Sequence, residues 1–255
     1  MTEPAVIVER HDQILTIALN RPAARNAINA AVAHGIAAAL ELLDEDPGLR
    51  VGILTGARDQ FCAGMDLKAF VQGENVVLEG RGFAGIAEKP PTKPLIAAVE
   101  GFAVAGGFEL ALACDIIVAG SESKFGIPEV KRGLVAGGGA LLRLPRQMPF
   151  RVAMELALTG DIVPAQRMLD LGLINRIVQA GQALTEARDI AAKIIDNSPL
   201  GVAASKAVIC QSQDWTIDEM FVRQDEIVGG IIASEDAREG AVAFAEKRRP
   251  VWQGK

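Results

Sequence analysis

The stretch that decides the fold is LIAAVEGFAVAGGFELALACDIIVAG, residues 95–120. Its first part, 95–101, and its last part, 115–120, are short apolar segments that are predicted to be buried strands. The residues between them open with two glycines and continue with apolar side chains, which predicts a helix from Gly106 to about Ala113. Strands that alternate with helices are typical of an α/β core.

The segments on either side extend the same pattern. Upstream, we expect a hairpin of two strands over 4–19 that turns at His11-Asp12, a helix over about 28–46 and a strand over 51–56. Downstream, we expect short helices over 138–146, 149–158 and 164–171, a short strand over 175–179, and then helices alone over 181–196, 199–212, 216–231 and 235–247. The segment 69–90 lacks clear periodicity and is interpreted as a lid. The chain is therefore predicted to form an α/β core over 1–196 and a helical region over 197–255.

The composition excludes several classes of protein. Of 255 residues, 50% are hydrophobic and 23% are charged, which is typical of a globular protein with a large core. The net charge of −6 and a single short basic run, Lys247–Arg249, do not indicate a nucleic-acid partner. No run of apolar residues is long enough for a membrane span, and the N-terminus does not resemble a targeting segment. Three widely spaced cysteines favour a reducing compartment, so we expect a cytoplasmic protein.

The common catalytic motifs are also missing. His11 and His34 are the only histidines, and neither lies next to a plausible nucleophile, so a Ser-His or Cys-His hydrolase is not expected. The sequence holds no HExxH motif and no pair of histidines at metal-binding spacing, so no metal site is predicted. The glycines at 101, 106 and 107 do not form GxGxxG, and the run 137–139 is not followed by Gly-Lys-Ser/Thr. Any chemistry must therefore use carboxylates and backbone groups.

Glu109 raises the main question, because a carboxylate among apolar residues is costly to bury unless it is neutralised or hydrogen-bonded. It belongs to AGGFE (105–109), one of three unusual stretches; the others are FCAGMDL (61–67) and KFGIPEV (124–130). Each has a plain structural explanation when taken alone. Asp66 could cap a short helix, Glu109 could cap the first turn of its own helix, and Glu129 could lie in a surface loop.

Taken together, these stretches resemble the enoyl-CoA hydratase/isomerase (crotonase) family, and the resemblance covers nearly the whole chain. It begins at LNRPAARNAI (19–28) and continues through FCAGMDL, KPLIAAVEGFAVAGGFELALACDIIVAG (93–120) and KFGIPEVKRGL (124–134). It ends with LTGDIVPAQRMLDLGLINRIV (158–178) and SEDAREGAVAFAEKRRPVW (234–252). The resemblance implies an α/β fold built as a crotonase-like spiral of ββα units. It also implies a helical C-terminal trimerisation region, and a homo-oligomer that is a trimer or a dimer of trimers.

The family pattern also implies roles for individual residues. The backbone N–H groups of Met65 and Gly106 match the oxyanion hole, which stabilises the enolate of a CoA thioester. Glu109 and Glu129 match the two hydratase carboxylates, with Glu109 activating the water and Glu129 supplying the proton. The CoA portion is expected against Arg25, Ala27, Ala63, Asp66, Leu67 and Lys68, and the acyl part against Val104, Gly107, Pro128, Leu134 and the segment 69–90. Such chemistry uses the CoA thioester as substrate and needs no metal or redox cofactor.

Three other activities remain open at this level. A Δ3,Δ2-enoyl-CoA isomerase would need Glu129 alone, so the presence of both glutamates favours reversible hydration. The segment VAGGGALLRLPR (135–146) and the C-terminal EGAVAFAEKRRPVWQGK look more like the carnitinyl-CoA dehydratase branch of the family. An acyl-CoA binder without turnover is the third, although a binder has no use for two desolvated acids.

Overall fold

The computed structural model describes residues 3–255, and its largest sheet has six strands in the order β1-β2-β3-β6-β8-β11. Strands β1 and β2 form an antiparallel hairpin, and every later neighbour in this sheet is parallel. The strands are β1 (Val6–His11), β2 (Ile14–Leu19), β3 (Val51–Gly56), β6 (Leu95–Val99), β8 (Ile116–Gly120) and β11 (Arg176–Val178).

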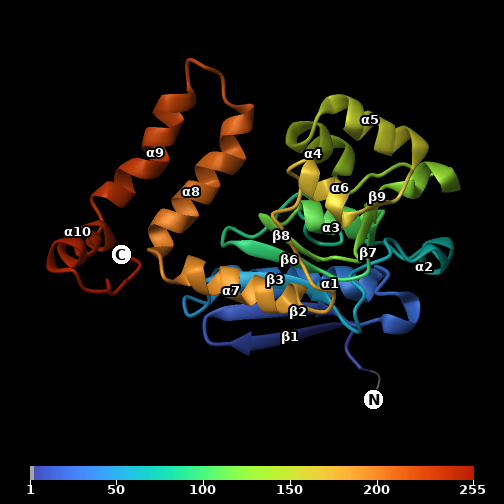
Figure 1. Cartoon of the computed structure of the whole chain (residues 1–255), viewed down its shortest axis with the longest axis horizontal. Helices are drawn as coiled ribbons and strands as arrows, with labels where there is room; N and C mark the ends of the chain where they lie inside the picture. Colours follow the sequence, from blue (N-terminus) through green and yellow to red (C-terminus); the bar gives the residue numbers. More distant parts are fainter. Residues whose placement is uncertain (1–2) are drawn as a thin grey trace.

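Alternating side chains of the parallel strands bury both faces of this sheet. In β6, Ile96 and Ala98 pack with helix α7 (Ala183–Ile195) in a small core, whereas Ala97 and Val99 belong to the main core on the other face. Helices α1 (Ala30–Glu45) and α3 (Gly106–Leu112) contribute to that main core. Figure 1 shows α7 lying along the sheet. Burial on two faces is the reason that strands such as LIAAV are apolar at every position.

A second, smaller sheet gives the chain its spiral form. After β6 the chain forms β7 (Phe102–Val104) and then α3, and after β8 it forms β9 (Lys124–Gly126) and then a 3₁₀ helix, Pro128–Arg132. After β3 it forms a single bridge at Cys62, parallel to Ala103, and then α2 (Leu67–Val71). Three successive turns thus run strand, strand, helix, and their second strands lie side by side, with β10 (Val163–Pro164) beyond β9.

The remaining core elements surround these turns. Strands β4 (Val77–Leu78) and β5 (Gly82–Phe83) form a two-stranded hairpin within the segment 69–90. Another 3₁₀ helix covers Pro22–Ala24. Helices α4 (Ala140–Gln147), α5 (Phe150–Thr159) and α6 (Ala165–Asp170) follow the third turn and lie together beside α3 (Figure 1).

The C-terminal helices stand away from the core. Figure 1 shows α8 (Pro199–Gln211) and α9 (Met220–Ile232) as a projecting hairpin, with a short 3₁₀ helix, Ser212–Asp214, between them. Helix α10 (Glu235–Glu246) follows them. Lys206 on α8 joins the hairpin to the core, since its ammonium donates to Asp115 at 2.7 Å and to the Lys93 carbonyl at 2.9 Å.

The predicted α/β core followed by helices is confirmed, with most element ends within two residues of the expected positions. Larger differences occur where pieces are short. Strands β7, β9 and β10 were not predicted, because two or three residues are too few to show periodicity. The segment 69–90 contains a hairpin, and α9 begins at Met220, four residues later than the predicted 216. The lid interpretation of 69–90 stays a prediction.

Candidate active site

The site lies where the three ββα turns leave the second sheet. Because Cys62 bridges Ala103 and Ala103 pairs with Phe125, the residues that follow them reach the same edge. Met65 comes three residues after Cys62, and Gly106 comes three residues after Ala103. The adjacency of the strands therefore brings together the ends of segments that are distant in the sequence.

The two predicted oxyanion-hole donors are close together and free to bind a ligand. Met65 forms a parallel bridge with Ile28, in which the Ile28 N–H donates to the Gly64 carbonyl and the Asp66 N–H donates to the Ile28 carbonyl. The N–H of Met65 itself therefore points away from residue 28. A Cβ atom on Gly64 would lie 3.2 Å from the Gly106 nitrogen. Among residues 3–255, no acceptor takes a hydrogen bond from the N–H of Met65 or of Gly106. Two neighbouring unpaired donors can bind an oxygen that gains negative charge.

Ala105 sets the direction of the Gly106 N–H. Its φ of 51° and ψ of −130° are unusual for a residue with a side chain, and such a backbone costs about 1–3 kcal/mol. The Gly126 carbonyl accepts from its N–H at 2.9 Å, which holds the strained peptide in place. Gly106 itself has no room for a side chain, because an added Cβ would lie 2.5 Å from Cζ of Phe83. Strain and close packing are thus concentrated at the donor.

Glu109 is buried and is held by the loop of three glycines, residues 137–139, that precedes α4 and is called the glycine loop below. Only 3% of the residue is exposed, and its Oε1 accepts from the Ala140 N–H at 3.1 Å. Burial raises the pKa of Glu109, while N–H groups of Ala140 and Gly138 and the positive charge of Arg143 oppose that rise. The plain explanation that Glu109 caps its own helix is wrong, because its side chain bonds to another element.

Glu129 is half-buried at the start of the 3₁₀ helix, directly after Pro128 fixes the chain direction. Burial, together with the smaller effect of the negative charge of Glu109, raises the pKa of Glu129 to about 7. Its Oε2 atom is buried and has no hydrogen-bond partner among the residues described. The surface-loop explanation is therefore wrong. A buried carboxyl oxygen without a partner is suited to a protonated acid or to a bound substrate or water.

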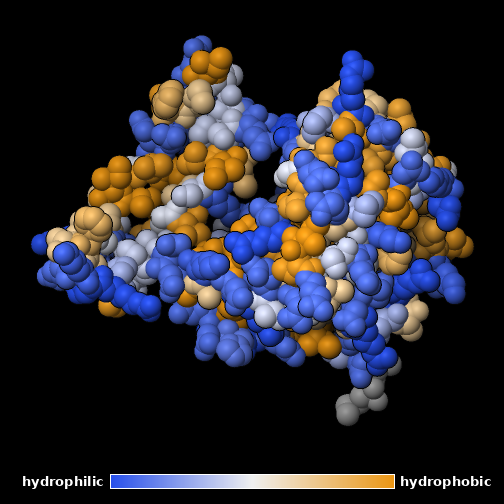
Figure 2. Space-filling view, in the orientation of Figure 1, coloured by the Kyte–Doolittle hydropathy of each residue, from blue (hydrophilic) through white to orange (hydrophobic). Residues whose placement is uncertain are grey.

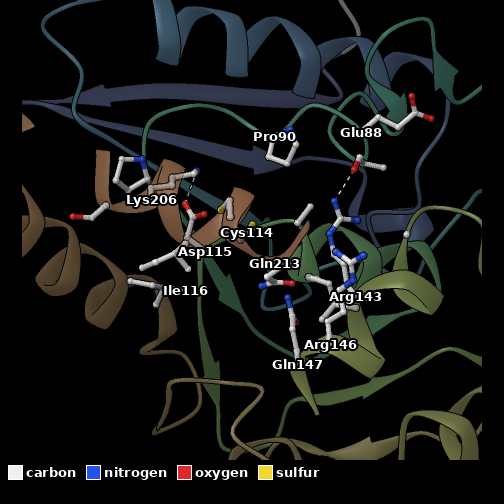
Figure 3. A pocket seen from close by; sticks show the side chains of 18 of the residues that line it. Glu88, Pro90, Cys114, Asp115, Ile116, Arg143, Arg146, Gln147, Lys206 and Gln213 are labelled. Carbon is white, nitrogen blue, oxygen red and sulfur yellow. Dashed lines mark hydrogen bonds and ion pairs between the residues drawn. The ribbon is translucent and has the colours of Figure 1, made fainter. Parts of the chain in front are cut away.

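A cleft of about 1180 Å³ adjoins this site. Figure 3 shows its lining, which includes Asp115 paired with Lys206, and Arg143, Arg146 and Gln147 from α4. Of the site predicted from the sequence, only the segment 69–90 lines this cleft, through Phe83, Ala87, Glu88 and Pro90. Phe83 and Gly138 line the cleft. A Cβ on Gly138 would lie 2.6 Å from Oε2 of Glu109 and 2.7 Å from Cδ1 of Phe83, so both residues also lie near the Glu109 carboxylate. They therefore connect the lining of the cleft with the surroundings of Glu109.

The residues expected to bind CoA lie near the Met65 segment with varied exposure. Arg25, Leu67 and Lys68 are exposed, Ala63 and Asp66 are half-buried, and Ala27 is buried. The Ala63 N–H donates to the Arg25 carbonyl at 3.1 Å, which joins the two predicted CoA-binding segments. The Asp66 carboxylate caps α2 and pairs with Arg21 at 2.8 Å, and the hydrogen bond from Arg21 holds the pKa of Asp66 low. The plain explanation for Asp66 as a helix cap is thus confirmed.

The residues expected around the acyl group also lie near Glu109 and Glu129. Val104 ends β7 and is buried, and Gly107 is so close to the Cys62 carbonyl that a Cβ would lie 2.2 Å from it. The Leu134 N–H donates to the Glu129 carbonyl at 3.1 Å, next to Pro128.

Of the basic C-terminal residues, Arg248 forms ion pairs with Glu239 and Glu246.

Sequence reasoning missed three residues that shape the site. Arg21 holds Asp66, Phe83 packs on Gly106, and Arg143 lies near Glu109. Phe83 lies in a segment that showed no motif, and Arg143 lies in VAGGGALLRLPR (135–146), which carried a resemblance but no role for this arginine. The only available signal for Phe83 was an aromatic residue in a glycine-rich segment.

Two general features of the described chain limit other interpretations. No cluster of three or more histidine, cysteine, aspartate or glutamate side chains is arranged as a metal site within residues 3–255. None of the helices described in this range is long and apolar enough to cross a membrane.

Comparison with known proteins identifies the family. Residues 9–255 match the family model described as enoyl-CoA hydratase/isomerase. The chain is 42% identical over 267 residues to "Enoyl-CoA hydratase EchA19" of Mycobacterium tuberculosis, covering 99% of this chain and 97% of that protein. It is 41% identical over 250 residues to "Carnitinyl-CoA dehydratase" of Proteus mirabilis, covering 95% of each.

Solved structures agree with these sequence relatives. An enoyl-CoA hydratase from Mycobacterium tuberculosis superposes with a TM-score of 0.98 at 60% identity, covering 99% of this chain and all of the other. Enoyl-CoA hydratase EchA1 from Mycobacterium marinum gives the same TM-score and coverage at 59% identity. The expected crotonase-like α/β fold is thereby confirmed. The unpaired amides, the two buried carboxyl groups and these comparisons agree, and the chain belongs to the enoyl-CoA hydratase/isomerase family.

Proposed function

We propose that this protein is an acyl-CoA hydro-lyase that adds water reversibly across the 2,3 double bond of an enoyl-CoA thioester. The observation that carries the proposal is the pairing of Glu109 with Glu129 beside the free N–H groups of Met65 and Gly106. Membership of the family and the similarity to proteins named enoyl-CoA hydratase support it.

In the proposed reaction, the thioester oxygen accepts hydrogen bonds from the Met65 and Gly106 N–H groups. A water oxygen forms a bond to C3 while the Glu109 carboxylate accepts one of its protons. The π electrons of the double bond move toward the thioester, and the two amides stabilise the resulting enolate oxygen by about 3 kcal/mol for each donor. The Glu129 carboxyl then delivers its proton to C2, which completes the 3-hydroxyacyl thioester.

Burial raises the pKa of both carboxyl groups, and the different surroundings of the two groups suit this division of roles. Glu129 has a pKa raised to about 7, so a large fraction of it carries a proton near neutral pH. Glu109 receives backbone N–H groups and faces Arg143, which favour its charged form. Two neighbouring carboxyl groups in different environments are the usual arrangement of an acid and a base.

Two classes of acyl group fit the proposed reaction. Relatives named carnitinyl-CoA dehydratase favour a polar branched acyl group, whereas the more similar solved structures are titled enoyl-CoA hydratase. Both reactions make or break a carbon–oxygen bond at C3, so the catalytic proposal is the same. An isomerase would use Glu129 alone and would leave the hydrogen-bonded Glu109 without a role.

The proposal also covers assembly, cofactors and location. Apolar side chains on the projecting helices α8 and α9 support a homo-oligomer, a trimer or a dimer of trimers (Figure 2). They are Ile209, Met220, Phe221, Val222 and Ile232, with Ile217 in the turn between the helices. The four catalytic groups supply every proton transfer and the charge stabilisation, so hydration calls on no metal or redox cofactor. Three free thiols support a cytoplasmic location.

The test is hydration of crotonyl-CoA, followed by loss of the ultraviolet absorbance of the conjugated thioester. We expect turnover by the wild type and a loss of roughly 100-fold or more in kcat for Glu109→Gln. Isomerisation of a 3-enoyl thioester, assayed in parallel, would persist in that variant if the protein were an isomerase. Binding of crotonyl-CoA with no change in absorbance would contradict the hydro-lyase proposal and favour a binder.

A further inference from the structure

We propose that Arg143 is a positioning residue for Glu109: its guanidinium holds the glycine loop that donates hydrogen bonds to the Glu109 carboxylate, and its positive charge favours the ionised form of that carboxylate. The inference rests on the proposed hydration, because only there does Glu109 serve as the base.

Arg143 connects two segments that come from different parts of the chain. It lies on the first turn of α4, and its Nη2 donates to the Ala87 carbonyl at 2.6 Å. Its Nη1 lies 3.5 Å from the Gly138 carbonyl, the outer limit of a hydrogen bond. Figure 3 shows Arg143 beside Arg146 at the wall of the cleft. The guanidinium therefore spans the gap between the segment that carries Phe83 and the glycine loop.

The glycine loop is shaped to accept this guanidinium. Gly139 has a φ of 105°, which favours glycine, and an added Cβ there would lie 2.1 Å from the Arg143 Nη1. The next residue, Ala140, donates its N–H to Glu109 Oε1. The loop thus holds Arg143 on one side and Glu109 on the other, so movement of the guanidinium changes the position of the N–H that binds the base.

The charge of Arg143 also acts on Glu109. The charged groups that face Glu109 are Arg143 from α4 and Glu129 from the 3₁₀ helix. Cys114 also lies near Arg143, but burial raises the pKa of its thiol, so it stays neutral. Within the described residues, no carboxylate lies within 4.0 Å of Arg143, so no direct ion pair neutralises its charge. Burial of both groups strengthens their attraction.

Lysine cannot replace arginine fully at this position. A guanidinium presents a planar fork of donors that can bind two carbonyls at once, whereas an ammonium is a point charge on a flexible chain. Arg143→Lys therefore keeps the charge and loses the connection between two segments. Arg143→Gln removes the charge as well, so the two variants separate the two parts of the proposal.

The test is the pH dependence of crotonyl-CoA hydration by wild type, Arg143→Gln and Arg143→Lys, with Arg146→Gln as the matched control. Arg146 lies one turn further along α4, lines the same cleft and pairs with the exposed Asp214. For Arg143→Gln we expect kcat to fall about tenfold or more, with KM changed less than about threefold. The acidic limb of kcat should move to higher pH, because an uncompensated Glu109 takes up a proton more readily. The basic limb, set by Glu129, should stay in place.

The outcomes separate the proposed role of Arg143 from the proposed hydration. Arg143→Lys should keep the acidic limb near that of the wild type and lose about fivefold or more in kcat. A folded Arg143→Gln with the wild-type acidic limb overturns the inference. If that variant does not fold, as judged by circular dichroism, Arg143→Lys with wild-type kcat overturns it. An inactive wild type would instead contradict the proposed hydration.

Discussion

Substitution of Gly138 by alanine should move Glu109, the proposed base, without changing its carboxyl group. The φ of Gly138 is one that alanine adopts without strain, so contacts alone decide the effect. The new Cβ would lie 2.6 Å from Oε2 of Glu109 and 2.7 Å from Cδ1 of Phe83. To reach an ordinary contact of 3.4 Å, the carboxylate must move by about 0.8 Å and the ring by about 0.7 Å.

That displacement has two measurable consequences. Misplacement of a reacting group by about 1 Å can reduce turnover by roughly 100-fold, so we expect kcat for crotonyl-CoA hydration to fall by that order. Overpacking of a buried position costs about 1–3 kcal/mol, which should lower Tm by roughly 2–8 °C for a chain of this length. The assays are steady-state hydration kinetics and thermal unfolding followed by circular dichroism.

Gly137 offers a matched control one residue away. A Cβ on Gly137 would approach nothing closer than the Val135 carbonyl at 4.0 Å, so Gly137→Ala should keep wild-type kcat and Tm. Wild-type turnover by Gly138→Ala would refute the argument that the loop fixes Glu109. Equal losses in both variants would refute it too, since they would indicate a general effect of stiffening the loop.

Three further predictions concern pH, stability and assembly. Glu129 must carry a proton to act as the acid, so kcat for hydration should fall as pH rises through about 7, the raised pKa of this group; a flat profile above neutrality would assign the acid elsewhere. Lys206→Met should leave Asp115 without its partner and lower the free energy of unfolding by about 2 kcal/mol, measured by urea denaturation. Unchanged stability would mean that the ion pair does not hold α8 to the core. Phe221→Glu should place a charge on the exposed apolar face of α9 and lower the mass measured by analytical ultracentrifugation; an unchanged mass would place the subunit contacts on another surface.

Family motifs explain why much of the fold and site could be predicted from the sequence. The continuous apolar run of β6 predicted a buried strand and the sequence of α7 predicted a helix, and the structure confirms both elements. The roles of Met65, Gly106, Glu109 and Glu129 came from the resemblance and stay predictions about function. Their spatial proximity depends on strands of one to three residues, β7, β9 and the bridge at Cys62, which carry no pattern of their own.

Other contributions to the site could not be predicted, because they depend on contacts between distant segments. The strained φ of Ala105 follows from its place between β7 and α3, and the residue type alone does not predict it. Arg143 reaches Ala87, 56 residues earlier in the chain, and Phe83 packs on Gly106 from a segment without periodicity. Glycine positions indicated close approach, but only the fold shows which side chains approach them.

The most direct test of the account is a crystal structure with an unreactive acyl-CoA analogue such as acetoacetyl-CoA. We predict that the thioester oxygen lies about 2.7–3.1 Å from the nitrogens of both Met65 and Gly106. We also predict that C3 of the acyl group lies between the carboxyl groups of Glu109 and Glu129. A thioester bound in the cleft beside Lys206, or an acyl group that reaches only one of the two glutamates, would contradict the account.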